Sequence, residues 1–296
     1  VQAWAVGIGG WALFRLARDR LGSEWAGLGF AVAYWLYPPL QGAVLNQYRF
    51  GFRPENFFPP IFLLAFYFLQ KERYRALMLL LPLALSIGES ETVLCASLGL
   101  YLLIFDRKRG RVGAAVLSLS LAWLALSVLV ILPLMRAGKP TWYAARAVER
   151  GDLIARFPAL AVSFALYTFQ LLGPVLFLPL ADLPLLAVAL PNALLNQAFL
   201  LIGYPTQARY DSPHVSTIAP VVFVSAVWGL GRLSSAVRST FAFENVRGVA
   251  EAGVVLACAL SGLWLGPLKV AYDVDAAKDE AVREIRATIP KEASLC

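Results

Sequence analysis

The sequence predicts an all-α protein, a polytopic transmembrane bundle of about nine spans, several of them short or kinked. Hydrophobic residues make up 59% of the 296 residues and charged residues only 15%, whereas soluble domains average about 25% charged residues. The charges that are present occur in clusters, so long stretches of the chain contain none. Because a soluble fold must cover its surface with polar groups, we expect this chain to fold in a lipid bilayer.

The residue counts also exclude several chemistries. His214 is the single histidine, so neither a His-rich zinc site nor a Ser-His-Asp triad is expected. Cys95 and Cys258 lie in apolar runs and Cys296 is the last residue, which gives no disulfide framework. The net charge of +7 fits Lys and Arg gathered in cytoplasmic loops. We expect a multi-pass protein of the cell membrane, in bacteria the inner membrane, with no nucleic acid partner, metal or cofactor.

The membrane segments follow from where apolar runs meet bends and charge clusters, since a spanning helix needs about 20 apolar residues. The expected segments are, in order, residues 1–16, 24–45, 57–70, 76–105, 112–135, 158–180, 184–203, 214–230 and 249–272. Pro38 and Pro39 should kink the second segment, because proline interrupts the helical hydrogen bonds. A tight turn at Asp182 should join the sixth segment to the seventh.

Two regions are expected along the chain. Residues 1–272 should form the transmembrane helical domain, and residues 273–296, charged and helical in character up to Pro290, should begin an external segment. Because Val1 opens with an apolar run already under way, we expect the transmembrane domain to be truncated at its N-terminus.

Orientation follows from the density of Lys and Arg, which favour the cytoplasmic side of short loops. The denser stretches are residues 15–20, 71–75, 107–111 and 232–247. They hold 13 basic residues, against 8 in the longer loops between them. We therefore expect these stretches to lie inside and the polar loop 46–56 to lie outside.

Segment 76–105 must then go out and come back, because basic clusters on the inner side bound it at both ends. The reversal belongs at Gly88–Glu91, which leaves arms of 13 or 14 residues. Each arm would be roughly 20 Å long, shorter than the hydrocarbon layer of about 30 Å. The turn should therefore lie in a recess open to the outside. The alternative is one straight helix with two mid-membrane glutamates, each costing about 2.5–3.5 kcal/mol.

The acids of this recess are the first candidate functional residues. Glu89 and Glu91 lie at the turn, and Glu55 lies in the preceding outer loop. An ionisable residue at membrane depth is a functional hypothesis by default. Glu89 and Glu91 point about 200° apart on a regular helix, since each residue turns the chain by about 100°, and we favour Glu89 as the one facing the cavity. Alternatively, both are turn residues at a hydrated helix end.

Outer arginines and the histidine are the second group of candidates. Arg49 and Arg53 precede Glu55, and Arg209 lies close before His214 at the outer mouth of a span. Five further basic residues occur on the outer side: Arg136, Lys139, Arg146, Arg150 and Arg156. The planar guanidinium suits phosphate recognition. Alternatively, these are solvated loop charges, and His214 caps a helix.

Several stretches resemble the "domain of unknown function 2079" family of predicted multi-pass membrane proteins, itself grouped by similarity with the GT-C class of membrane glycosyltransferases. They include GFRPENFFPP, ESETVLCASLGLYLLI and LLGPVLFLPLADLPLLAVALPNALLNQ. Two more are RYDSPHVSTIAPVVFVSAVWGLGRL and ATIPKEASLC. The chain departs from the family at its polar landmarks. Only Phe52, Pro54 and Glu55 match an Asp-Phe-His-Pro-Glu pattern, and only Glu89 matches a Lys-Glu-Asp pattern.

The resemblance implies a GT-C-like glycosyltransferase that takes its sugar from a polyprenyl-phosphate donor on the outer face of the membrane. It places Glu89 and Glu55 in assisting catalytic roles, with the primary acid in an outer loop upstream of Val1. The leaving lipid phosphate would explain the outer arginines, because its developing charge needs stabilising. Glu91, Arg49, Arg53, Arg209 and His214 are the expected substrate-binding residues. A membrane transporter and a non-catalytic membrane scaffold remain the alternative functions.

Overall fold

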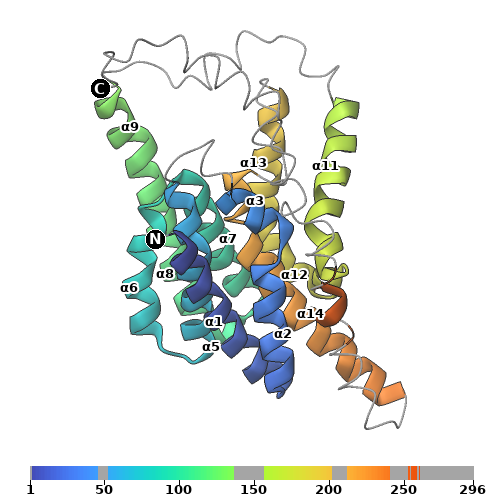
Figure 1. The fold of residues 1–296 in the computed structure, drawn as a ribbon. Helices are drawn as coiled ribbons and strands as arrows, with labels where there is room; N and C mark the ends of the chain where they lie inside the picture. The colour runs from blue at the N-terminus through green and yellow to red at the C-terminus, as the bar shows by residue number, and fades with distance from the viewer. Residues whose placement is uncertain are drawn as a thin grey trace, which may run out of the picture.

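The computed structural model describes residues 2–45, 53–136, 157–201 and 212–240, together with residues 253, 255–258 and 260. Every regular element in these residues is helical, which confirms the all-α prediction (Figure 1). The expected external segment, residues 273–296, lies outside the described residues.

The first three helices confirm the kink expected at the paired prolines. Helix α1 (Gln2–Leu21) is followed by α2 (Glu24–Trp35), whose first turn is capped by the hydroxyl of Ser23. The chain breaks at residues 36–37 and resumes as α3 (Pro38–Leu45). Proline is favoured in the first turn of a helix, where its missing N–H has no partner to lose.

The next elements form the reversal predicted within segment 76–105. A 3₁₀ turn, η1 (Pro54–Phe57), leads into α5 (Phe58–Gln70), and α6 (Tyr74–Leu85) then packs beside α7 (Glu89–Phe105). The helix breaks at residues 86–88, two to three residues before the turn expected at Gly88–Glu91, so Glu89 and Glu91 lie in the first turn of α7. The 12 residues of α6 span roughly 18 Å, so this arm is shorter than the hydrocarbon layer of about 30 Å.

One long apolar rod follows the hairpin. It consists of η2 (Arg107–Arg109), α8 (Gly110–Leu126), the π-helical turn η3 (Ser127–Ile131) and α9 (Leu132–Met135). The π turn lies immediately before Pro133, whose missing N–H interrupts the regular ladder. Large side chains on its far end, such as Leu134, are exposed, as expected for a surface that faces lipid.

Helices α7 and α8 approach each other through glycine. A Cβ added at Gly99 would lie 2.6 Å from the backbone N of Leu117, and one added at Gly113 would lie 2.8 Å from the carbonyl oxygen of Gly99. No larger side chain fits without separating the two backbones. Small residues bring membrane helices together in this way, so the returning arm of the hairpin is held firmly against the long rod.

The reversal expected at Asp182 is wider than a tight turn. Helix α11 (Phe157–Leu172) ends eight residues earlier than the expected segment, and α13 (Leu190–Leu201) begins six residues later than its expected start. Between them the chain forms η5 (Gly173–Val175), η6 (Leu178–Asp182), α12 (Leu183–Leu186) and η7 (Ala187–Ala189). Prolines at positions 174, 179 and 184 break the regular hydrogen bonding here.

The last long helix lies at the centre of the packing. After η8 (Pro213–Val215), α14 (Ala219–Thr240) contacts α1, α5, α12 and η6. The ring of Phe223 packs edge-on against Tyr34 and Tyr37, with ring centroids 5.3 and 5.0 Å apart. Beside it, the hydroxyl of Tyr37 donates a hydrogen bond of 2.7 Å to the carbonyl of Leu171, which joins the connection between α2 and α3 to α11.

Three helical stretches among the described residues are long and apolar enough to cross a membrane: Arg107–Met135, Leu178–Phe199 and Ala219–Ala236. Other apolar helices, such as α6, are shorter. The molecule therefore combines full-length spans with short segments. In Figure 1, α9, α11 and α13 extend beyond the end of the α6–α7 hairpin.

Candidate functional site

Glu55 is positioned by bonds from two other parts of the chain. The hydroxyl of Ser216 donates to the Glu55 carbonyl at 3.3 Å. The neighbouring side chain, Asn56, is fully buried, and its Nδ2 donates to the carbonyl of Ala43 at 3.4 Å. Turn η1 is thus fixed between α3 and the start of α14.

Glu91, not Glu89, is the glutamate that the hairpin encloses. Glu91 is 1% exposed, whereas Glu89 is exposed. The hydroxyl of Ser90 donates to Glu91 Oε2 at 3.0 Å, and Asn192 Nδ2 donates to the carbonyl of Ser90 at 2.8 Å. Because α7 starts directly at Glu89, residues 89 and 91 point in nearly opposite directions. The sequence predicted this divergence but favoured the other residue.

His214 lies in η8 at the start of the last long helix. Its backbone N–H donates to Ser212 Oγ at 3.3 Å, and its carbonyl accepts from Thr217 Oγ1 at 2.8 Å. The charges of Glu55 and Arg53 both act electrostatically on its imidazole.

Charges from separate segments meet at this position. Arg53 and Glu55 both act electrostatically on His214, while Glu55 and Glu89 act on Glu91. Asn192 joins them through Ser90. We call Arg53, Glu55, Glu91, Asn192 and His214 the η1–α7–η8 cluster.

Three acceptor atoms of this cluster are buried without a hydrogen-bond donor among the described residues: Glu55 Oε2, Glu91 Oε1 and Asn192 Oδ1. A buried acceptor left unsatisfied costs about 1–3 kcal/mol. A molecule carrying several hydroxyl or N–H donors would satisfy all three. The nearby Arg53 adds a positive charge beside these acceptors.

The cluster lies within the length of a span. Asn192 precedes the end of the apolar stretch Leu178–Phe199 by seven residues, roughly 10 Å at 1.5 Å per residue. Because Asn192 bonds to the carbonyl of Ser90, next to Glu91, we expect the glutamates to lie at membrane depth. Such residues in membrane proteins mark functional sites by default.

The structure describes five of the seven predicted site residues. It brings together Arg53, Glu55, Glu91 and His214, and it leaves Glu89 at the exposed edge beside them. Arg49 and Arg209 lie outside the described residues, as do the four basic residues expected between positions 139 and 156.

Two asparagines of α13 were missed by the sequence analysis. Asn192 and Asn196 are both buried, and Asn196 Nδ2 donates to the Tyr167 hydroxyl at 3.1 Å and to the His214 carbonyl at 3.5 Å. Their spacing of four residues in an apolar run places both on one helix face. That spacing was the available signal. A metal is not suggested by the donor set, since the described residues contain no group of three His, Cys, Asp or Glu able to hold one.

Comparison with known proteins gives a single result. A family model described as "Predicted membrane protein (DUF2079)" matches residues 1–294. No curated protein and no solved structure matches the chain.

Proposed function

Since the chain belongs to the DUF2079 family of predicted membrane proteins and is thus an integral membrane protein, we propose that it is a GT-C-like glycosyltransferase. Its donor would be a sugar linked to polyprenyl phosphate, used on the outer face of the membrane. The proposal extends the family assignment to an activity through the chemistry of the η1–α7–η8 cluster.

The observation that carries the proposal is the set of three unpaired, buried acceptors beside an arginine. A sugar is a dense array of hydroxyl donors, which is what Glu55 Oε2, Glu91 Oε1 and Asn192 Oδ1 lack. A phosphate-linked sugar adds an anion that Arg53 would attract. A scaffold without a ligand would gain nothing from keeping these acceptors together at membrane depth.

The reaction assigns a role to each charge. The acceptor hydroxyl oxygen attacks the anomeric carbon, the bond from that carbon to the phosphate oxygen breaks, and the phosphate leaves with the electron pair. Arg53 would stabilise the charge that develops on the phosphate. Glu91 and Glu55 would orient the sugar through its hydroxyls, and a carboxylate takes the proton of the acceptor. His214 would accept or donate a hydrogen bond to the ligand.

The test is transfer by the purified full chain in liposomes, with a polyprenyl-phosphate-linked sugar as donor. We expect Glu91→Gln to lower the transfer rate by about tenfold or more, because a hydrogen bond from a sugar hydroxyl to a charged group contributes about 1.5–3 kcal/mol. Glu89→Gln should lower it less, because Glu89 is exposed. The matched control is Glu72→Gln, an exposed glutamate in the connection between α5 and α6.

A transfer rate equal to the wild type in the Glu91→Gln variant would refute the role of Glu91 in binding the sugar. Absence of transfer by the wild-type chain, combined with solute uptake that Glu91→Gln abolishes, would instead identify a transporter that uses the same acids.

A further inference from the structure

A second polar site lies at the opposite end of the bundle, away from the η1–α7–η8 cluster. A pocket of about 250 Å³ opens between the C-terminal ends of α1 and α5 and the middle of α14. Asp19, Arg20 and Lys71 form its polar side, and Tyr67 and Trp228 form its aromatic side. None of these residues takes part in the proposed transfer reaction.

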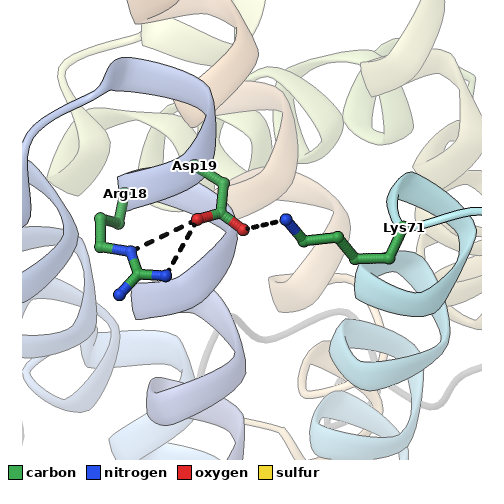
Figure 2. A network of polar contacts seen from close by, with 3 residues as sticks. All are labelled: Arg18, Asp19 and Lys71. Carbon is green, nitrogen blue, oxygen red and sulfur yellow. Dashed lines mark hydrogen bonds and ion pairs between the residues drawn. The ribbon is translucent and has the colours of Figure 1, made fainter.

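Figure 2 shows the ionic network at the edge of the pocket. The Asp19 carboxylate accepts from Arg18 at 3.1 Å on one oxygen and from Lys71 at 2.9 Å on the other. These two cations hold the pKa of Asp19 below its ordinary value although burial opposes the shift. The carboxylate is therefore ionised at neutral pH, and it joins α1 to α5.

The cations of the pocket nevertheless outnumber its anion. Arg20 and Lys71 line the pocket together with the carboxylate of Asp19, which leaves a formal net charge of +1 among the lining residues. The C-terminal ends of α1 and α5 each contribute about half a negative charge, which falls off within the last turn. Because Asp19 is bonded to Arg18 and Lys71, Arg20 is the lining cation that forms no salt bridge in the described part of the chain.

The cations are also placed over aromatic rings. The guanidinium of Arg20 lies 5.4 Å from the ring centroid of Trp228, and the Lys71 ammonium lies 5.9 Å from that of Tyr67. Trp and Tyr with adjacent basic residues are typical of the membrane interface, where one side of a site is apolar and the other hydrated. A ligand here would need an anionic head and an apolar body.

The location agrees with that requirement. Arg109 and Arg232 both act electrostatically on Tyr101. Arg232 and Arg20 both act on Asp182. The basic residues of several segments therefore share this end of the molecule. By the positive-inside rule this end faces the cytoplasm. Basic pockets between membrane helices on that side suit anionic lipid headgroups.

We propose that this pocket binds the phosphate headgroup of an anionic phospholipid from the cytoplasmic leaflet. Arg20 and Lys71 hold the phosphate, and Tyr67 and Trp228 pack against the glycerol and the first acyl carbons. Asp19 limits the affinity by competing for Lys71 and Arg18.

The experiment is native mass spectrometry of the full chain in detergent, titrated with phosphatidylglycerol and, separately, with phosphatidylcholine. We expect one phosphatidylglycerol to bind more tightly than any phosphatidylcholine. Arg20→Gln should weaken it about fivefold, since one basic residue near the surface contributes about 1 kcal/mol. Asp19→Asn should instead strengthen it, because Lys71 and Arg18 are released. A misfolded variant would not bind more tightly, so this change separates binding from folding.

The matched control is Lys108→Gln, an exposed cation at the same end but outside the pocket. If Lys108→Gln and Arg20→Gln weaken phosphatidylglycerol binding equally, the binding depends on general surface charge and the proposal is overturned. Equal affinity for phosphatidylglycerol and phosphatidylcholine would also overturn it. Displacement of phosphatidylglycerol by inorganic phosphate alone would identify a site for a free anion instead of a lipid.

Discussion

At the scale of single residues, the buried side chain of Glu91 has the clearest functional implication. One of its oxygens accepts from Ser90, and the other has no donor in the described part of the chain. Its neighbours Asn192 and Glu55 also present unpaired acceptors. Three such atoms together support the proposed binding site, because a purely structural network would satisfy them internally.

Arg53 tests whether the bound group is a phosphate. In Arg53→Lys the charge is kept but the planar, two-pronged donor is lost. We expect affinity for a polyprenyl phosphate to fall about tenfold or more, because one charge-assisted hydrogen bond contributes about 1.5–3 kcal/mol. Equilibrium binding to the reconstituted protein measures this, with Arg107→Lys, an exposed position on the expected inner side, as the control. Equal affinity of Arg53→Lys and the wild type would make Arg53 an ordinary loop charge.

Side-chain chemistry made part of this site predictable. Glu55, Glu91 and His214 were identified because charged or titratable groups are rare in this chain and costly at membrane depth. Asn192 was missed because a neutral amide in an apolar run carries a weak signal by itself. The choice between Glu89 and Glu91 depended on where α7 begins, which the sequence leaves open by a residue or two.

At the scale of elements, the α6–α7 hairpin determines where the site lies. A reversal in this segment and the kink before α3 were both predicted from glycine, proline and charge positions. The observed break at residues 86–88 lies two to three residues before the expected turn at Gly88–Glu91. The irregular stretch from 173 to 189 was not predicted. There, three prolines act together with Leu176 and Phe177, which adopt left-handed backbone conformations. Such strain in non-glycine residues is set by tertiary packing and leaves no local pattern.

The direction of the hairpin is testable by cysteine labelling. In a chain whose three native cysteines are replaced by serine, Ser90→Cys should react with an impermeant thiol reagent added to intact cells. The recess that contains it is expected to open outward. Arg73→Cys, in the connection between α5 and α6, should react only after the membrane is opened. The reverse pattern would invert the topology, and protection of both positions would contradict the open recess.

At the scale of the whole molecule, α14 packs against the chain reversal at residues 173–189 and against α1 and α5. It thereby connects the early helices of the bundle to the later ones. The connection is ionic as well as apolar. Asp182 is 0% exposed and its Oδ1 lies 3.0 Å from Arg232 Nη2, whereas Arg232 is 51% exposed. The pair therefore joins a fully buried carboxylate to a cation that water can reach.

This asymmetry predicts unequal effects of removing either partner. Arg232→Gln should destabilise the fold by up to about 3–5 kcal/mol, because it leaves a buried carboxylate without its counterion. Asp182→Asn should cost less, since the half-exposed arginine can be solvated. Thermal unfolding in detergent ranks the two variants, with Arg107→Gln as an exposed control. A larger loss for Asp182→Asn would show that the carboxylate has other essential partners.

The bond between Asn192 and the tip of the hairpin also has a consequence for biogenesis. Its two residues are 102 positions apart in the chain, and ribosomes add about 5–20 residues per second. The hairpin tip therefore exists for roughly 5–20 seconds before the helix that completes it has been synthesised. During that interval the short arms and the glutamate at their turn form an unfinished insertion intermediate. We expect the nascent protein to be most exposed to membrane chaperones and quality-control proteases at this stage.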